Sequence, residues 1–144
     1  MVQRREIAAW GPRPLPVIDA DSGFFWKAGE AGSLRVQRCA CGRYQHPPMP
    51  RCLACGGGDV SPVDVSGVGR VATFTINHQP WRRELPVPYV FAAVELAEQE
   101  QLYLLTNIVD CDPEDVAIGM PVEVFFVQHE DVWLPLFRPR GDKA

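Results

Sequence analysis

The chain of 144 residues has no apolar run of about 18 residues and no apolar signal segment near its start. It also lacks the local signatures of common enzymes: there is no G-x-S-x-G, no H-E-x-x-H and no phosphate-binding loop. Candidate nucleophiles and bases exist, but none stands in such a motif: Cys111, His46, His78 and His129. We therefore expect a cytoplasmic protein that makes no membrane contact and is not catalytic alone.

Basic residues are scarce in the second part of the chain. Residues 1–51 hold eight of the 14 Lys and Arg but only four of the 18 Asp and Glu, so the excess of acidic residues behind the net charge of -4 lies in residues 52–144. A barrel that binds nucleic acid is expected to be basic, which argues against a nucleic-acid partner. A single-stranded nucleic-acid-binding protein stays open as an alternative, because strand aromatics could stack bases: Phe74, Phe91, Tyr103 and Phe125.

Long helices are not expected either, because 14 prolines and 12 glycines interrupt the chain. Alternating apolar residues predict short strands instead, at 34–38, 60–65, 70–77, 89–96, 102–109, 122–128 and 132–137. One short helix is expected through 24–31, capped by Asp21 or Ser22, and Asp112 begins a second helical turn. The fold class is mainly β, with these predicted parts: an N-terminal arm and helix (1–33), a ribbon (34–59), a small OB-type Greek-key barrel (60–140) and a tail (141–144).

The most informative feature that is present is a group of four cysteines in one short window: Cys39, Cys41, Cys52 and Cys55. Two close thiol pairs separated by about 10 residues are typical of a tetrahedral zinc site, and each pair is followed by a glycine that permits positive φ. Redox-active pairs and a metal-free ribbon are the alternatives. The first pair is C-x-C, one residue shorter than the usual C-x-x-C. We predict one structural zinc per chain in a rubredoxin-like ribbon.

Three groups of residues are candidates for contact with a partner or ligand. The segment 77–88 is too long for a simple hairpin turn and contains residue types common in interfaces: His78, Trp81, Arg82 and Arg83. The last predicted strand contains Pro135 and ends at Pro139, which predicts an edge strand that presents Trp133, Phe137 and Arg138. The short helix has more large apolar groups than one narrow buried stripe needs. Phe25 and Trp26 are therefore the third group of candidates for contact with a partner or ligand. Core packing is the alternative for Trp133 and Phe137.

The order of these parts resembles a family of zinc-ribbon plus OB-fold proteins associated with acyl-CoA metabolism, catalogued as domain of unknown function thirty-five. The likeness extends from about Leu15 to Pro139, and the short C-x-C is its one clear departure. One part of the likeness is the cysteine ribbon with the segment that crosses it, Tyr44–Pro50, which contains Pro47 and Pro48 and is called the Pro-Pro crossing below. The likeness also depends on three further segments: LTNIVD (105–110), IGMPV (118–122) and LFRP (136–139).

The resemblance implies an accessory role beside a thiolase-fold or lipid-transfer-protein-like aldolase that cleaves carbon–carbon bonds of acyl-CoA thioesters. Steroid side-chain degradation is the implied pathway, with acyl-CoA bound at or near the interface. A homodimeric partner carrying two copies of this chain is expected, because thiolase folds usually pair by two-fold symmetry. A hot-dog-fold hydratase, an acyltransferase or a thiolase are alternative partners, and a stand-alone acyl-CoA binder is a further alternative.

Overall fold

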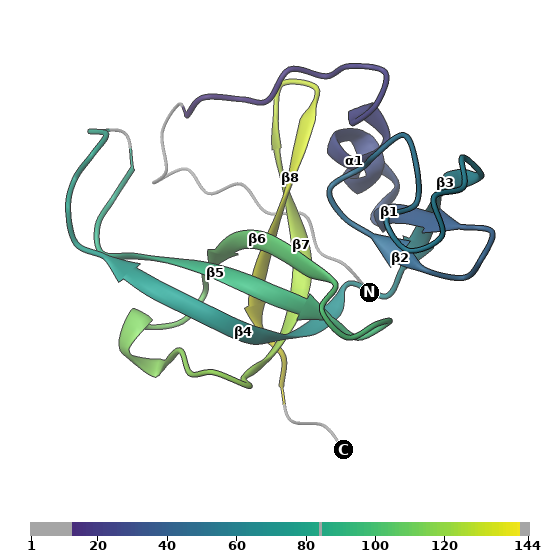
Figure 1. Ribbon diagram of the computed structural model, residues 1–144. Helices are drawn as coiled ribbons and strands as arrows, with labels where there is room; N and C mark the ends of the chain where they lie inside the picture. Colours follow the sequence, from purple (N-terminus) through teal and green to yellow (C-terminus); the bar gives the residue numbers. More distant parts are fainter. Residues whose placement is uncertain (1–12, 84, 142–144) are drawn as a thin grey trace.

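The computed structural model describes residues 13–83 and 85–141. Within these residues a three-stranded sheet lies beside a closed five-stranded barrel, and a short helix packs between them (Figure 1). The mainly β class, with a ribbon followed by a small OB-type barrel, is thus confirmed. The predicted arm (1–33) and tail (141–144) fall partly outside the described residues. No helix in the described part of the chain has the length and apolar character needed to cross a membrane.

The barrel closes in the order β4-β5-β6-β8-β7, which is the strand order of an OB fold. A single turn of 3₁₀ helix, η3, connects β6 to β7. The N-terminal Asp112 accepts a hydrogen bond from the Glu114 amide at 3.0 Å, so the predicted cap is confirmed. The bounds are β4 (Val68–Asn77), β5 (Tyr89–Leu96), β6 (Tyr103–Ile108), η3 (Pro113–Asp115), β7 (Pro121–His129) and β8 (Val132–Pro139).

The ribbon sheet has the order β2-β1-β3, with β1 (Leu34–Cys39) at its centre and β2 (Tyr44–Gln45) on one side. The strand predicted at Val60–Val65 is present as β3, but it pairs with β1 along its whole length rather than with a barrel strand. This pairing extends the ribbon sheet beyond the cysteines, and the barrel strands begin at Val68. The domain limits drawn from the sequence remain predictions, because strand pairing alone does not define a domain.

The helical segment consists of α1 (Gly23–Lys27) and a 3₁₀ turn, η2 (Ala28–Ala31). Ser22 is the N-cap residue, but its side chain makes no capping hydrogen bond. Asp19 fixes the entry instead, since its Oδ1 accepts from the amides of Asp21 at 3.0 Å and Ser22 at 2.7 Å. The prediction that Asp21 or Ser22 caps this helix is thus confirmed for the position of Ser22, but the side chain that accepts the amide hydrogen bonds is that of Asp19.

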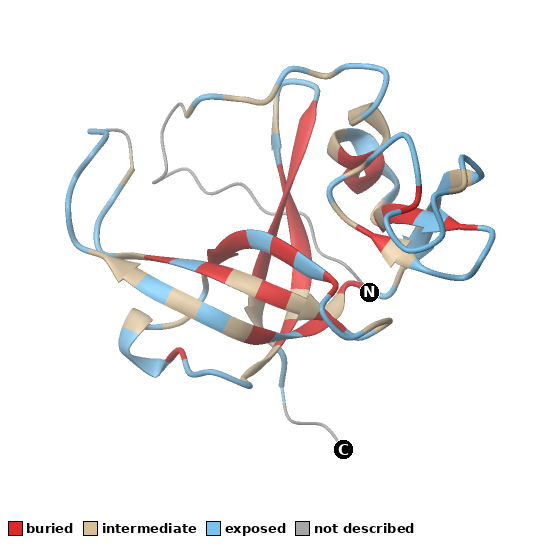
Figure 2. Cartoon of the chain, in the orientation of Figure 1, coloured by how far each residue is buried: buried red, intermediate tan, exposed pale blue. Residues whose placement is uncertain are grey.

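Gly29 sets how closely the helix approaches the barrel. A Cβ atom at this position would lie 2.5 Å from the Phe126 ring and 2.6 Å from Trp133 Cβ, which no real side chain tolerates. The helix therefore rests directly on β7 and β8. Apolar residues of the helix and of β1 join the barrel interior in one cluster, which includes Phe25, Leu34 and Val36. Figure 2 shows this buried layer in the helix, in β1 and in the barrel strands.

Strand β8 is an interior strand of the closed barrel, which corrects the prediction of an edge strand. It pairs with β7 over its whole length, from Val132 to Pro139. Towards β6 the ladder has a single pair, Ile108 with Phe137, and the Thr106 hydroxyl donates to the Pro135 carbonyl at 2.9 Å. A side-chain donor thus connects β6 to β8 beside a residue that has no N–H, so a proline is tolerated inside the barrel.

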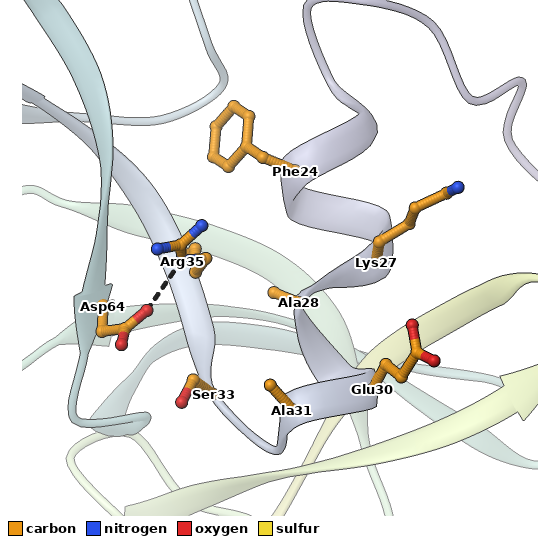
Figure 3. A pocket seen from close by; sticks show the side chains of 8 residues that line it. All are labelled: Phe24, Lys27, Ala28, Glu30, Ala31, Ser33, Arg35 and Asp64. Carbon is orange, nitrogen blue, oxygen red and sulfur yellow. Dashed lines mark hydrogen bonds and ion pairs between the residues drawn. The ribbon is translucent and has the colours of Figure 1, made fainter.

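A cavity of about 600 Å³ opens between the helical segment and the ribbon sheet. Figure 3 shows Phe24 and Ala28 on the helical segment, opposite the Arg35–Asp64 ion pair that links β1 to β3 at 2.7 Å, whereas the Lys27 side chain points away from this pair. Glu30 is the fourth charged group of the lining, so the cavity carries two charges of each sign.

Candidate functional site

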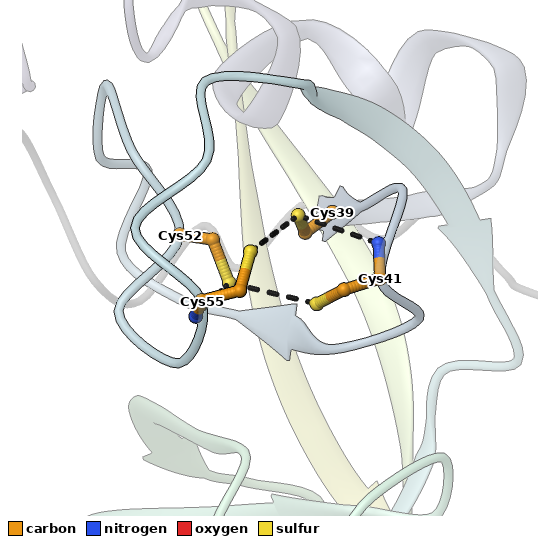
Figure 4. A group of neighbouring side chains, drawn as sticks. All are labelled: Cys39, Cys41, Cys52 and Cys55. Atoms are coloured by element: carbon orange, nitrogen blue, oxygen red, sulfur yellow. Dashed lines mark hydrogen bonds between the residues drawn. The ribbon is translucent and has the colours of Figure 1, made fainter.

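The four cysteine sulfurs converge at the tip of the ribbon (Figure 4), and all lie within 4.8 Å of one another. The Sγ atoms of Cys39 and Cys55 are 3.6 Å apart, and those of Cys41 and Cys52 are 3.8 Å apart. Four thiolates about 2.3 Å from a tetrahedral zinc are separated by about 3.8 Å, so these distances fit that ion. All five cysteines of the chain are unpaired by disulfides. The predicted ligand set can hold one metal ion.

Backbone amides surround three of the four sulfurs. Cys39 accepts from the Cys41 amide at 3.5 Å, and Cys52 accepts from the Ala54 and Cys55 amides at 3.4 and 3.5 Å. Cys55 accepts from the Gly57 amide at 3.4 Å. Positive φ at Gly42 and Gly56 turns the chain after each pair, as expected, although these two glycine amides donate to carbonyls of Cys39 and Cys52. Such donors stabilise thiolates and orient metal ligands.

The electrostatic surroundings differ between the two buried cysteines. Amide donors from Cys55 and Ala54 lower the pKa of Cys52 to about 6. The Cys41 amide lowers the pKa of Cys39, but burial and the neighbouring thiols outweigh it and raise that pKa to about 12. A bound divalent cation favours the thiolate form at every sulfur. With four protein ligands the metal would have no open position, so its role would be structural rather than catalytic.

Two buried glutamines support the ribbon and were not identified from the sequence. Gln37 on β1 donates to the Met49 carbonyl at 2.8 Å and accepts from the Met49 amide at 3.0 Å. Gln45 on β2 donates to Gln37 Oε1 at 2.6 Å and to the Arg51 carbonyl at 3.1 Å, and accepts from the Leu53 amide at 3.0 Å. These bonds hold the Pro-Pro crossing and the second cysteine pair against the sheet. Nothing in their local sequence distinguishes them from solvent-facing strand residues.

Gln99 joins the ribbon to the barrel. Its side-chain amide donates to the Tyr44 carbonyl and accepts from the Tyr44 amide, both at 2.9 Å, so it acts as a short strand partner for β2. His46 follows β2 and packs on Phe25, with ring centroids 4.7 Å apart. Burial lowers the pKa of His46 to about 4, and its Nδ1 has no hydrogen-bond partner. His46 is therefore a packing residue.

An apolar groove lies on the outer face of β5 and β6. It consists of two adjoining cavities of about 430 and 160 Å³ that share Arg13, Phe91 and Asn107; we call it the outer groove. The larger cavity reaches α1 and the Pro-Pro crossing, and the smaller one reaches the end of the β4–β5 loop. Its other main lining residues are Trp26, His46, Pro47, Pro48, Leu85, Tyr89, Tyr103, Leu105 and Leu134.

Three residues make the outer groove an exposed apolar surface: Phe91 is 43% exposed, Tyr103 43% and Leu105 64%. Strand alternation predicts that these three side chains point outward, because their neighbours Val90, Ala92 and Leu104 point inward and are buried. Large apolar residues at outward positions of such strands are the pattern of a surface that contacts something. The sequence indicates Phe91 and Tyr103 only as base-stacking candidates, and Leu105 only as part of the segment 105–110.

The predicted contact residues of the β4–β5 loop are exposed: His78, Trp81, Arg82 and Arg83. Trp81 is 75% exposed, and its indole N–H donates to Asn77 Oδ1 at 3.1 Å, which fixes the ring at the surface. The same loop supplies Leu85 to the outer groove. The helix contributes differently: Trp26 lines the groove half-buried, whereas Phe25 is only 5% exposed and packs in the core. Contact by this loop and by Trp26 stays a prediction.

The C-terminal candidates belong to the interior. Trp133 is 5% exposed and Phe137 is fully buried, so the expectation that they contact a partner is corrected in favour of core packing. Both side chains were assigned to an edge strand that does not exist. Arg138 pairs with Glu123 at 3.0 Å and lies over the Phe125 ring, so its guanidinium is occupied within the barrel.

The described residues do not bring a nucleophile and a base together. No cysteine, serine or threonine side chain among them is hydrogen-bonded to a histidine side chain. Burial and the carboxylates of Asp115, Asp112 and Asp110 raise the pKa of Cys111, which makes this lone thiol a poor nucleophile at neutral pH.

Comparisons with known proteins identify both parts of the chain. Residues 26–61 match the family model described as "ChsH2, rubredoxin-like zinc ribbon domain", and residues 62–127 match "ChsH2, C-terminal OB-fold domain". The predicted zinc ribbon, whose four cysteines can bind one metal ion, is confirmed.

Among curated proteins, the chain is 39% identical over 129 residues to a "Probable enoyl-CoA hydratase alpha subunit" of Thermomonospora curvata, covering 88% of this chain and 40% of the relative. It is 36% identical over 124 residues to the "3-oxo-4,17-pregnadiene-20-carboxyl-CoA hydratase alpha subunit" of Mycobacterium tuberculosis, covering 86% and 39%. The chain thus spans about two fifths of the length of these relatives.

Among solved structures, a chain of the "Ltp2-ChsH2(DUF35) aldolase" superposes with a TM-score of 0.78 at 38% identity. The match covers 87% of this chain and 98% of that chain. The resemblance inferred from the cysteine ribbon and the barrel segments is therefore confirmed, and the chain belongs to the DUF35 family, with a zinc ribbon and an OB-fold domain of the ChsH2 type.

Proposed function

We propose that this chain is a non-catalytic accessory subunit that binds and completes a thiolase-fold aldolase acting on acyl-CoA thioesters. The favoured reaction is retro-aldol cleavage of a steroid side chain. The observation that carries this proposal is the match to a chain of an Ltp2-ChsH2(DUF35) aldolase, which extends over 98% of that chain at 38% identity.

The chemistry of the described residues supports an accessory role. A carbon–carbon lyase needs groups that move protons at the reacting carbons, and such groups must lie within hydrogen-bond reach of the substrate. The described residues offer no paired nucleophile and base, and the metal ligands form a closed set. The reacting groups would accordingly come from the partner subunit.

The outer groove supplies a surface on which such a partner could dock. Its exposed members Phe91, Tyr103 and Leu105 are large apolar groups of the kind that anchor interfaces. Trp81 extends this surface along the β4–β5 loop with an indole fixed by Asn77. The guanidinium groups of Arg82 and Arg83 would then lie where they could pair with a CoA phosphate. The expected assembly holds two copies of this chain on a two-fold symmetric partner.

Co-expression tests the proposal. A thiolase-like aldolase subunit from the same genome should co-purify with this chain, and Leu105→Asp should weaken binding roughly tenfold or more because it places a charge in an apolar contact. Ile118→Asp is the matched control, since Ile118 is 71% exposed but does not line the outer groove. If no thiolase-like subunit co-purifies, and that subunit is soluble and active without this chain, the accessory role is refuted.

A hydratase partner is the second candidate, because both curated relatives named above are hydratase alpha subunits. The two candidates differ in the reaction of the purified complex. An aldolase cleaves a β-hydroxyacyl-CoA into two carbonyl products, whereas a hydratase adds water to an enoyl-CoA without changing the carbon skeleton. Mass spectrometry of the thioester products separates them.

A further inference from the structure

The two cysteine pairs protect their sulfurs unequally. In the longer pair, Cys52 accepts two amide hydrogen bonds and Cys55 accepts one from Gly57. In the short pair, the Cys41 amide turns back to Cys39, and no N–H of the described residues donates to Cys41 Sγ. Cys41 is also exposed, whereas Cys39 and Cys52 are buried. Cys41 is thus the one ligand that combines access to solvent with an unshielded sulfur.

These two properties govern the chemistry of a thiolate. Amide donors withdraw charge from sulfur and reduce its nucleophilicity, so a thiolate without them reacts faster with electrophiles. Exposure lets an oxidant approach. Cys55 is also exposed, but the Gly57 amide donates to its sulfur at 3.4 Å. We propose that Cys41 is the ligand at which a peroxide oxidises the zinc-loaded ribbon, with release of the metal.

The reaction balances in two steps. The Cys41 thiolate attacks one oxygen of hydrogen peroxide, the O–O bond breaks, and a sulfenic acid and hydroxide form. The Cys52 thiolate, whose sulfur lies 3.8 Å away, then attacks the Cys41 sulfur and displaces a second hydroxide. Two thiolates lose two electrons in total, and the peroxide is reduced. The new S–S bond of about 2.05 Å takes Cys41 and Cys52 out of the ligand set, so only Cys39 and Cys55 would remain to hold a zinc ion and the ion would be released.

The test uses the zinc-loaded chain of 144 residues carrying Cys111→Ser, so that only ribbon thiols react. Hydrogen peroxide is added below one equivalent, with dimedone to trap sulfenic acids and a chromogenic chelator to record free zinc. Peptide mass spectrometry should find the first adduct at Cys41. Without dimedone, a Cys41–Cys52 disulfide should accumulate at the same rate as free zinc. A first adduct at Cys39, Cys52 or Cys55 overturns the proposal, as does zinc that stays bound after Cys41 is oxidised.

A second variant tests the physical cause. Inserting one glycine between Cys39 and Ala40 restores a C-x-x-C pair of the same length as Cys52–Cys55. Zinc release by peroxide should become roughly tenfold slower, the smaller end of the effect expected for outer-shell hydrogen bonds. An unchanged rate in a zinc-loaded insertion variant contradicts the proposal. If this variant does not bind zinc, the adduct map of the parent chain decides alone.

Discussion

The ribbon and the barrel lie side by side but are stabilised by different interactions. The barrel encloses side chains with almost no exposure, among them Leu104, Phe126 and Phe137, so burial of apolar surface stabilises it. The tip of the ribbon has no comparable core, and its fixed points are four cysteine sulfurs and two glutamine side chains. We therefore expect the two parts to unfold independently. Loss of metal or of hydrogen bonds should unfold the ribbon tip, whereas loss of apolar packing should unfold the barrel.

Metal removal should separate the two parts most strongly. Structural zinc contributes roughly 10–16 kcal/mol of apparent binding free energy in small zinc modules. Chelation, or Cys52→Ser, should therefore remove amide-exchange protection from residues 39–57 while β4 to β8 stay protected. Hydrogen exchange read by mass spectrometry checks this, with Cys111→Ser as the cysteine control. Loss of protection throughout the barrel would show that the two parts do not fail separately.

Truncation in the barrel core should have the next largest effect. Phe126 is fully buried and faces Gly29 of the helical segment, so Phe126→Ala leaves a cavity where barrel and helix meet. We expect a loss of about 3–5 kcal/mol in the free energy of unfolding measured with urea. Leu53→Ala, at a site that is 76% exposed, should change it by about 0.5 kcal/mol or less. A loss below about 1 kcal/mol at Phe126 contradicts the packing described above.

Acid should weaken the contact between ribbon and helix through His46. The folded-state pKa of about 4 lies below the ordinary 6.5, so the folded protein binds fewer protons than the unfolded chain between these values. Stability should be full above pH 6.5 and fall towards pH 4, by about 3 kcal/mol in total. Acid also protonates the thiolates, so the measured quantity is the difference between the parent chain and His46→Phe. Equal pH profiles for the two proteins would contradict this prediction.

The glutamine pair should show the smallest effect, confined to the ribbon. Gln45→Met keeps the size of the side chain but leaves the Leu53 amide and the Arg51 carbonyl without their partner. We expect the free energy of unfolding, measured with urea, to fall by about 1–3 kcal/mol. We expect the zinc affinity, measured by chelator competition, to fall at least tenfold. Gln101→Met, at an exposed turn, is the control. A variant that binds zinc as tightly as the parent chain would exclude a supporting role for this pair.

The parts of the structure that local patterns govern could be predicted from the sequence. Alternation of apolar residues placed each barrel strand to within a few residues, because each strand has one face in a common core. Cysteine spacing identified the metal ligands, because the ribbon brings near neighbours in sequence to one point. These features need no knowledge of long-range pairing.

The features that depend on pairing between distant strands could not be predicted. A proline such as Pro135 predicts an edge strand when the neighbours of its strand are unknown. In the barrel, β8 pairs with β7 on one side, and on the other side the Thr106 hydroxyl donates to the Pro135 carbonyl. The supporting role of Gln37 and Gln45 depends on their hydrogen bonds to the carbonyls of Met49 and Arg51, which lie further along the chain. The strand pattern around the two glutamines does not indicate these bonds. The outer groove joins an arm residue, α1, the Pro-Pro crossing and three barrel strands, so no single segment indicates it.

The most direct test of the central claim is the activity of a reconstituted complex. The purified chain is titrated into a thiolase-like aldolase subunit from the same genome, and cleavage of a β-hydroxyacyl-CoA with a steroid side chain is followed by mass spectrometry. The account predicts that neither protein cleaves the thioester efficiently alone and that activity saturates at one copy of this chain per partner subunit. Full activity of the partner alone, unchanged by added chain, would contradict it.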